Sequence, residues 1–497
     1  MASGSMVSGS MAAPGTPARP DRVVPSWVDP VVAQASEVVG GPWGRNAVTG
    51  RALFWTPLRV CLLFATLVLA LAWLKVAPCS DGNWPGSKQY THLCYTDPVP
   101  LFGLHHLDTG AVPYLDSAVE YPVLSGGFMA LAAAIARGYD GLAASFPLLP
   151  QVPPVQSYDV VTCLLLSLCA LVTVRAVLAL SGRRPWDAAM VALSPLVFME
   201  AFINWDLLAI ALTMLGMWAW ARRRPVLAGV LLGLGVAAKL YPVLILGVLF
   251  VLCLRAGRLR PWFRATLAAA VTCLAVNLPI AVLAPQNWAR FFELNSSRPA
   301  NPETLWNLAL TLTHHTILDG PLGPDETPSV LNASVAVASV LVAVAVGWLA
   351  LAVPLRPRVA QVAFLLVAGF LLVNKVWSPQ YSLWLLPLAV LARPRWRSLL
   401  LWQVTEVLVW VVTMLYYLGA DHRGIGVQWF FLGVGLRDVA VVVLMALVVR
   451  DILHPDRDVV RMTWLGVDDP AGGVLEHAPD KVRLGRSPRP AAVARSG

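Results

Sequence analysis

The chain has 497 residues, of which 57% are hydrophobic and only 13% are charged. This composition excludes an ordinary soluble protein and is typical of an all-α polytopic membrane protein. The net charge of +9 does not indicate a nucleic-acid partner, because the basic residues lie in short turns between apolar runs, as cytoplasmic loops do.

The first 52 residues are rich in Ser, Gly, Pro and Ala and predict a flexible cytoplasmic tail. An apolar run of spanning length begins near residue 53, behind this polar tail, so a cleaved signal peptide is not expected. Residues 53–450 are expected to form one transmembrane domain. Residues 451–497 mix both charge signs with Pro and Gly and predict a second flexible cytoplasmic tail.

The loop after the first apolar run contains two cysteines, Cys79 and Cys94, that flank a polar insert. If this loop is extracytoplasmic, the two cysteines can form a disulfide, and the alternative is a pair of free thiols. The other five cysteines fall in apolar runs and are expected to be small core residues.

The same loop concentrates acids in a chain that otherwise avoids charge. The stretch "CYTDPVPLFGLHHLDTGAVPYLDSAVEYP" carries Asp97, Asp108, Asp116 and Glu120. A carboxylate at the membrane boundary can act as a general base toward a sugar hydroxyl. We assign this role to Asp97, close to the end of the first span, with Asp108 and Asp116 as alternatives. The competing interpretation is that all four are solvated loop acids.

Clusters of arginine mark the expected cytoplasmic turns, for example "RRRP" at 222–225 and "RPR" at 356–358. They predict roughly 11 to 13 transmembrane helices with both termini inside. Apolar segments near Asp206 and Lys239 turn back after about 14 to 18 residues, and such short helices are tolerated only inside protein or beside a wet cavity. We therefore expect a cavity open to the outer face. Whether the helix after Glu120 crosses fully or re-enters is left open.

Several polar residues are candidates to line that cavity. Asp206 begins an apolar helix, where it either caps the helix or faces the cavity as a second carboxylate. Lys239 lies between apolar stretches, so it either snorkels to the interface or binds an anion such as phosphate. The guanidinium of Arg298 suits phosphate oxygens, and Lys375 at a helix end is a third candidate phosphate ligand. The remaining candidates for the cavity and the acceptor are Glu120, Asn204, Tyr241, Gln380 and Tyr381.

Motifs of other catalytic classes do not occur in the sequence. There is no glycine-rich phosphate loop, no paired CxxC, no HExxH and no nucleophile elbow. The histidine pairs at 105–106 and 314–315 consist of adjacent residues, whose side chains point apart on regular elements. We therefore predict no metal site.

The order and spacing of six short motifs resemble one family. These motifs are "CYTD", "VPYLD…EYPVL", "RRPWDA", "NWDLLAIAL", "GVLLGLGVAAKLYP" and "SPQYSLWLLPL". Over about residues 53–400 the chain resembles a GT-C-fold membrane glycosyltransferase. It is most similar to glycosyltransferase family 87, the polyprenol-phosphate-mannose-dependent α-mannosyltransferase-like proteins of actinobacteria.

The resemblance implies a multi-pass enzyme of the plasma membrane with an extracytoplasmic active site. It implies transfer of a hexose, usually mannose, from a polyprenyl-phosphate sugar to a lipid or glycan acceptor, with inversion at the anomeric carbon. Asp97 matches the loop aspartate that acts as the base in the family. A divalent metal is compatible with this chemistry but not required, and the expected partners are the donor, the acceptor and membrane lipids.

Two other functions remain as alternatives. A transporter or lipid-linked sugar flippase would use charges inside or near the spans, and a catalytically silent scaffold would need none of the outer acids. The charged residues that motivate the transporter hypothesis are Arg175, Glu200, Glu406, Arg437 and Asp438.

Overall fold

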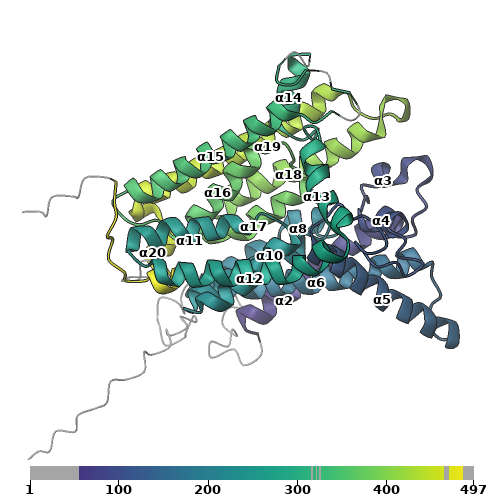
Figure 1. Cartoon of the computed structure of the whole chain (residues 1–497), viewed down its shortest axis with the longest axis horizontal. Coiled ribbons are helices and arrows are strands. Elements are labelled where there is room, and N and C mark those ends of the chain that lie inside the picture. Colours follow the sequence, from purple (N-terminus) through teal and green to yellow (C-terminus); the bar gives the residue numbers. More distant parts are fainter. Residues whose placement is uncertain (1–54, 315–316, 321, 324–325, 464–468, 485–497) are drawn as a thin grey trace, which may run out of the picture. The chain divides into compact units, whose positions relative to one another are not determined.

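The structure is a computed structural model that describes residues 55–314, 317–320, 322–323, 326–463 and 469–484. These residues form helices and loops, with no β-strand among them (Figure 1). The chain divides into a short unit, residues 1–59, and a large unit, residues 60–497, to which nearly all the described residues belong. The predicted N-terminal tail, residues 1–52, lies outside the described residues.

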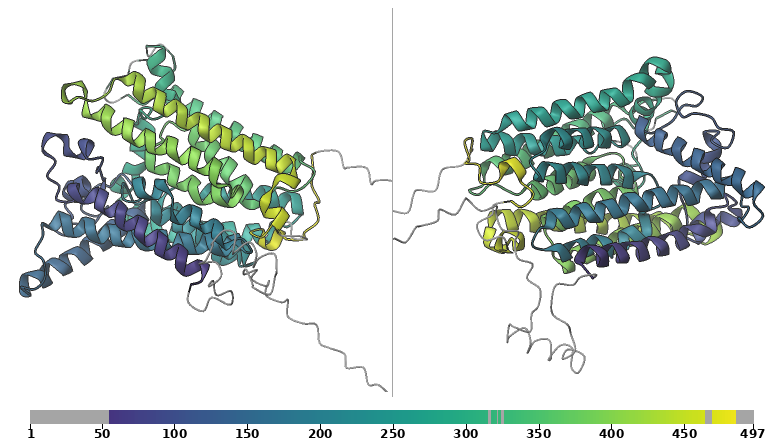
Figure 2. Two further views of the ribbon diagram at one scale, coloured as in Figure 1. Left: turned by 180° about the vertical axis from the view of Figure 1, so that it is seen from behind. Right: turned by 90° about the horizontal axis from the view of Figure 1, so that it is seen from below.

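Among the described residues, six helices are long and apolar enough to cross a membrane, as expected for a polytopic membrane protein. Two of the six, α15 and α19, both pack against the shorter helix α16 (Figure 1 and Figure 2). The six are α2 (Pro57–Val76), α6 (Pro154–Ser181), α12 (Leu259–Leu283), α15 (Ser329–Ala352), α18 (Trp396–Leu418) and α19 (Val427–Leu453).

Five further apolar helices are too short to span alone, so the long helices are fewer than the 11 to 13 spans expected. Nearly every residue of α16 and α17 is buried, whereas α10 and α11 also have exposed apolar residues such as Val226 and Phe250. Protein around α16 and α17 satisfies the requirement that the ends of such short helices avoid lipid. The five are α9 (Asp206–Ala221), α10 (Pro225–Ala238), α11 (Val243–Ala256), α16 (Val359–Val373) and α17 (Ser382–Ala392).

The glycines of α10 allow it to pack closely against α12. A side chain at Gly229 would clash with the backbone of Ala265, and one at Gly233 with the backbone of Ala269. Small residues at such positions let helix backbones approach each other. This contact fixes the path of α10 and therefore the place where Lys239 follows it.

The helix after Glu120, α5 (Val123–Ser145), begins inside the large unit. The hydroxyl of Ser125 donates to the carbonyl of Ala238, at the end of α10. α10 begins directly after the arginines at 222–224 and ends at Ala238. The start of α5 therefore lies at the end of α10 that is away from these arginines. α6 packs against α5 and runs on to the next basic turn, at 182–184. Among the described helices, α5 is not one of the six that are long and apolar enough to cross a membrane.

Short helices connect these elements. At the end of the unit that lies away from the arginine turns they include α3 (Lys88–Thr91), α4 (Pro98–Leu104), α13 (Pro285–Ser297) and α14 (Leu305–Leu312). Others precede α9 and α17 or follow α19: η3 (Pro185–Ala188), α7 (Ala189–Ala192), α8 (Pro195–Glu200), η4 (Pro379–Tyr381), η6 (Pro455–Arg457), α20 (Val459–Thr463) and η7 (Gly473–Leu475).

Residues 454–463 and 469–484 fold against the arginine turns, whereas the sequence suggested a flexible tail there. Arg358 Nε pairs with Asp458 Oδ2 at 2.8 Å, and both side chains are buried. Arg255 Nη2 and Arg356 Nη1 pair with the two carboxylate oxygens of Asp480 at 2.6 and 3.1 Å. Two of the acids in this segment, Asp458 and Asp480, are the partners of buried arginines. Its cytoplasmic location stays a prediction.

Candidate active site

The segment before α4 is fixed to the turn before α9. Cys79 and Cys94 form a disulfide, which closes the loop that precedes this segment. The hydroxyl of Thr96 donates to the carbonyl of Phe202 at 2.8 Å, and the backbone N–H of Asp97 donates to the carbonyl of Ile203 at the same distance. Two distant parts of the sequence thus meet where Asp97 and Asn204 lie.

Asp97 is half-buried and held by Asn204. Asn204 Nδ2 donates to Asp97 Oδ2 at 2.6 Å and also contacts the Tyr121 hydroxyl at 2.9 Å. Burial raises the pKa of the Asp97 carboxyl, while hydrogen bonds from Tyr95 and Asn204 and the charge of Lys239 oppose that rise. A half-buried carboxylate with a raised pKa that hydrogen bonds hold in one orientation is suited to accept a proton.

Lys239 lies between this carboxylate and a second, buried one. Its Nζ is 3.3 Å from Oδ1 of Asp206, and Trp384 Nε1 donates to the same oxygen at 2.8 Å. The Nζ also lies 5.3 Å from the ring centre of Tyr121 and 4.9 Å from that of Tyr381. Asp206 is 1% exposed. It is therefore suited to hold Lys239 in place and not to contact a substrate. Asn204 Oδ1 accepts the backbone N–H of Trp205, the residue before α9, at 2.6 Å.

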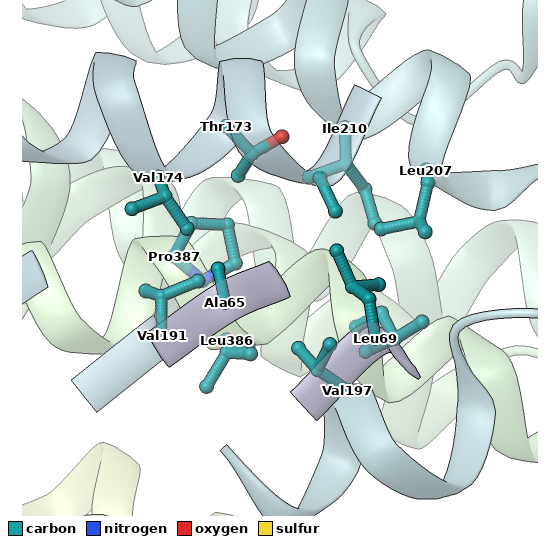
Figure 3. A pocket seen from close by; sticks show the side chains of 12 residues that line it. Ala65, Leu69, Thr173, Val174, Val191, Val197, Leu207, Ile210, Leu386 and Pro387 are labelled. Carbon is teal, nitrogen blue, oxygen red and sulfur yellow. The ribbon is translucent and has the colours of Figure 1, made fainter. Parts of the chain in front are cut away.

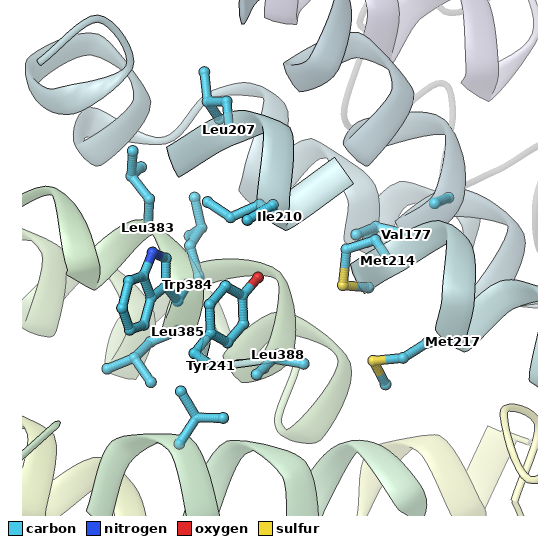
Figure 4. Packing of buried hydrophobic residues seen from close by; sticks show 14 of the residues in the cluster. Val177, Leu207, Ile210, Met214, Met217, Tyr241, Leu383, Trp384, Leu385 and Leu388 are labelled. Atoms are coloured by element: carbon cyan, nitrogen blue, oxygen red, sulfur yellow. The ribbon is translucent and has the colours of Figure 1, made fainter. Parts of the chain in front are cut away.

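Three stacked aromatic rings support this ion pair. The ring of Trp384 stacks on Tyr381 with centres 4.1 Å apart and on Tyr241 with centres 4.4 Å apart. Figure 4 shows Trp384 and Tyr241 side by side within the apolar core. Tyr381 is half-buried and forms the outer end of the stack, so it is the ring that a ligand can reach.

Lys375 and Arg298 form a second cationic group. Lys375 Nζ donates to the carbonyls of Arg298 and Ser296 at 2.6 and 3.3 Å, and the N–H of Asn301 donates to the Lys375 carbonyl at 2.8 Å. Lys375 is 6% exposed. Within the described part of the chain, no carboxylate forms an ion pair with either cation. Burial, followed by the nearby charge of Arg298, lowers the pKa of Lys375 to about 8.

The structure brings together most of the predicted site residues, in two groups. Asp97, Asn204, Asp206, Lys239 and Tyr381 are joined by the contacts above, through Tyr121 and Trp384. Arg298 and Lys375 form the other group, and no hydrogen bond or ion pair between described residues links the two. Glu120 is half-buried and close enough to Asp97 to interact with it electrostatically, and Gln380 is buried in η4.

The two alternative bases do not contact this cluster. Asp108 is exposed, and Asp116 Oδ2 accepts a hydrogen bond from the backbone N–H of Val112 at 2.7 Å, which closes a local turn. Of the histidine pairs, His105 is buried and His315 lies outside the described residues. No group of three metal-binding side chains occurs among the residues that the structure describes.

Sequence reasoning missed Tyr95, Tyr121 and Trp384 as members of the site. Tyr121 stands in "EYP" beside Glu120, and Trp384 follows Tyr381 by three residues, a spacing that places both on one face of a helix. Proximity in the sequence to a predicted site residue was thus the one feature that could have identified Tyr121 and Trp384. A buried aromatic residue in an apolar helix cannot be distinguished from a core residue by its sequence.

An apolar cavity adjoins the buried end of the site (Figure 3). Leu207 and Leu383 line it, and they are the chain neighbours of Asp206 and Trp384. Its other lining residues come from α2, α6, α7, α8, α9 and α17, and Thr173 is the one polar side chain among them.

Comparison with known proteins supports the resemblance noted in the sequence. Residues 141–375 match the model of glycosyltransferase family 87. No curated protein matches the chain. The matched range includes Asn204, Asp206, Lys239, Arg298 and Lys375, while Asp97 precedes it. The family match indicates a glycosyltransferase, and the helices are those of a membrane protein.

Proposed function

We propose that this chain, whose residues 141–375 match glycosyltransferase family 87, transfers a hexose from a polyprenyl-phosphate sugar to a lipid or glycan acceptor. Mannose is the proposed hexose, and the anomeric carbon is inverted. The proposed location is the plasma membrane, with the site on the extracytoplasmic face, where a lipid carrier must replace the nucleotide sugars of the cytoplasm.

One observation carries the proposal: a half-buried carboxylate and a pair of cations that form no ion pair with a described carboxylate occupy separate places in one membrane unit. Asp97 is held by hydrogen bonds from Tyr95 and Asn204, whereas Asp206 is committed to Lys239. Arg298 and Lys375 carry positive charge without a carboxylate partner in the described residues, which suits an anionic ligand. A base and a phosphate site are the two elements that a single displacement at a sugar phosphate needs.

In the proposed reaction, the acceptor hydroxyl attacks the anomeric carbon of the donor sugar. The hydroxyl proton passes to the carboxylate of Asp97, while Asn204 keeps that carboxylate oriented. The bond between the anomeric carbon and the phosphate oxygen breaks, and its electron pair stays on the phosphate, which Arg298 and Lys375 stabilise. One displacement inverts the configuration and leaves no covalent intermediate on the enzyme.

Two of the charges behind the transporter alternative, those of Arg437 and Arg175, have local partners. Arg437 Nε pairs with its neighbour Asp438 at 2.7 Å, and the guanidinium of Arg175 lies 4.8 Å from the ring centre of Trp218. Charges that are satisfied by local partners do not indicate a path for a substrate.

The test is transfer of labelled mannose from polyprenyl-phosphate mannose by the full chain in lipid vesicles. Asp97→Asn should lower kcat by about 100- to 10,000-fold, the usual contribution of a general base. Asp108→Asn, in the same loop, should retain wild-type transfer. A chelator should leave the rate unchanged, because two cations supply the charge. Normal transfer by Asp97→Asn would remove Asp97 from the base role, and transport without covalent change would favour the alternative.

A further inference from the structure

A second group of charged side chains lies apart from the proposed reaction, where α8 packs against α18. Glu200, at the end of α8, is 1% exposed, and Glu406, in the middle of α18, is 0% exposed. Arg437 of α19 is also 0% exposed, and Lys75 at the end of α2 is half-buried. None of these residues contacts Asp97 or Lys375.

The two cations are occupied by groups other than the two glutamates. Arg437 Nε pairs with Asp438 Oδ1 at 2.7 Å, its Nη2 donates to the Glu303 carbonyl at 2.5 Å, and its guanidinium stacks 3.8 Å from the ring centre of Trp377. Lys75 Nζ donates to the Met199 carbonyl at 2.5 Å. Among the described residues, neither cation forms an ion pair with Glu200 or Glu406.

The two glutamates are short of hydrogen-bond partners. Glu406 Oε1 accepts from Trp402 Nε1 at 2.7 Å, but Glu406 Oε2 and both oxygens of Glu200 have no partner in the described structure. Arg437 Nη1 and Trp410 Nε1 are buried donors that also lack a partner. Buried polar groups normally find a partner, so an unpaired set of this kind indicates bound protons or ordered water.

The charges around the pair do not balance. Both Lys75 and Arg437 act electrostatically on Glu200, and Arg437 also acts on Glu406, but Arg437 already forms an ion pair with Asp438. One further cation, Lys75, is thus left for the two carboxylates Glu200 and Glu406. The other titratable groups nearby are Asp206 of α9, which pairs with Lys239, and Cys163 of α6. An ionised carboxylate buried without a partner is costly, and it takes up a proton instead.

We propose that Glu200 and Glu406 form a proton-binding pair that holds one proton at neutral pH, with Lys75 balancing the remaining negative charge. Two acids that share a confined site keep one proton between them, because ionising both would place two negative charges close together in a buried environment. We favour a proton over a metal cation as the bound species. Arg437 Nη1 and Trp410 Nε1 are buried hydrogen-bond donors without an acceptor in the described structure, and the positive ends of these N–H groups would repel a metal cation.

The first test is the unfolding midpoint of the full chain in detergent, measured from about pH 6 to pH 9. The folded pair binds its proton more tightly than the unfolded chain does, so wild-type stability should fall as the pH rises across this range. Glu406→Gln supplies a permanently neutral partner. It should unfold at the wild-type temperature or higher near pH 7 and should show a weaker fall toward pH 9.

The matched control is Asp458→Asn, which removes the charge of a buried acid that does pair with an arginine, Arg358. This variant should unfold at a clearly lower temperature near pH 7. The proposal is overturned if Glu406→Gln and Glu200→Gln are each destabilised as much as Asp458→Asn. It is also overturned if the wild-type midpoint depends on Na⁺ or K⁺ and not on pH.

Infrared spectroscopy provides a test that does not depend on the variants folding. The wild-type chain at neutral pH should show the C=O stretch of a protonated carboxyl group that is shielded from exchange. Wild-type protein without this band would overturn the proposal. Where Glu200→Gln or Glu406→Gln folds, the band should be lost or shifted, and an unchanged band in both variants would overturn the proposal as well.

Discussion

At the scale of single residues, the two buried lysines of the site differ in the groups that neutralise or solvate their charge. Lys239 has a carboxylate partner, Asp206, and two aromatic rings nearby. Lys375 has only carbonyl oxygens as acceptors and a second cation, Arg298, beside it. Lys239 can stay charged without a ligand, whereas the charge of Lys375 is best stabilised by a bound anion.

This difference predicts a pH dependence of donor binding. The pKa of Lys375 is lowered to about 8, so the side chain is charged below that pH and loses its charge as the pH rises through it. The KM for the polyprenyl-phosphate donor should therefore increase above about pH 8. Lys375→Arg should keep a low KM over the same range, because arginine stays charged.

Lys375→Met should raise the donor KM by about 10- to 100-fold below about pH 8, the usual value of a hydrogen bond to a charged group. The difference from the wild-type chain should shrink at higher pH. Lys88→Met is the control, since Lys88 pairs with Asp81 in a partly exposed position. If Lys375→Arg shows the same alkaline rise in KM as the wild-type chain, another group causes it.

The sequence predicted some residues of the site but not the contacts between them. The concentration of acids in one loop pointed to Asp97, and the cost of an unpaired ammonium pointed to Lys239. The sequence could not show that Asp206 is the partner of Lys239, because that contact depends on how α9 and α10 pack. The sequence placed Lys239, Arg298 and Lys375 in one phosphate site, whereas the contacts divide them into two groups. Their roles in donor binding stay predictions.

At the scale of elements, the disulfide loop determines how firmly Asp97 is held. Cys79 and Cys94 are 15 residues apart, and Cys94 is followed closely by Thr96 and Asp97, which bond to the turn before α9. A crosslink over a loop of this length contributes about 3 kcal/mol by restricting the unfolded chain. The double variant Cys79→Ser, Cys94→Ser should therefore unfold at a lower temperature and transfer sugar more slowly than the wild-type chain.

A reductant should slow wild-type transfer but leave the rate of this double variant unchanged. Cys273→Ser, which changes a free cysteine in α12, should behave as the wild-type chain does. Full activity of the double variant would mean that the hydrogen bonds of Thr96 and Asp97 hold the loop without the crosslink.

The short helices were partly predictable as elements. Apolar stretches that ended early near Asp206 and Lys239 indicated helices buried in protein, and α9 and α10 have that form. The course of α5 was not predictable, because its apolar composition suits a full crossing as well as a re-entrant helix. The contact between Ser125 and Ala238 fixes where α5 begins, and it is a tertiary contact that the sequence does not reveal.

At the scale of the whole molecule, the arginine turns have a role that their sequence did not reveal. Clusters of arginine between apolar runs predict orientation in the membrane. In the structure, Arg255, Arg356 and Arg358 are buried and bond to residues near the end of the described chain. Arginines that orient a chain in the membrane and arginines that form buried ion pairs give the same sequence pattern. The positions of Asp458 and Asp480 in the folded chain show that these arginines form buried ion pairs.

The final prediction concerns this contact between the C-terminal segment and the helices. Arg358 bonds to Asp458 and also to the carbonyls of Leu391 and Ala392, so the pair connects the start of α16, the end of α17 and the segment after α19. Asp458→Ala leaves a buried guanidinium without its counter-charge, which costs about 3 to 5 kcal/mol. Asp456→Ala, at an exposed position two residues away, should have almost no effect. Thermal unfolding of both variants in detergent compares them directly. Equal midpoints would show that the segment lies against the helices without stabilising them, whereas a large gap means that orientation signals and fold stability depend on the same arginines.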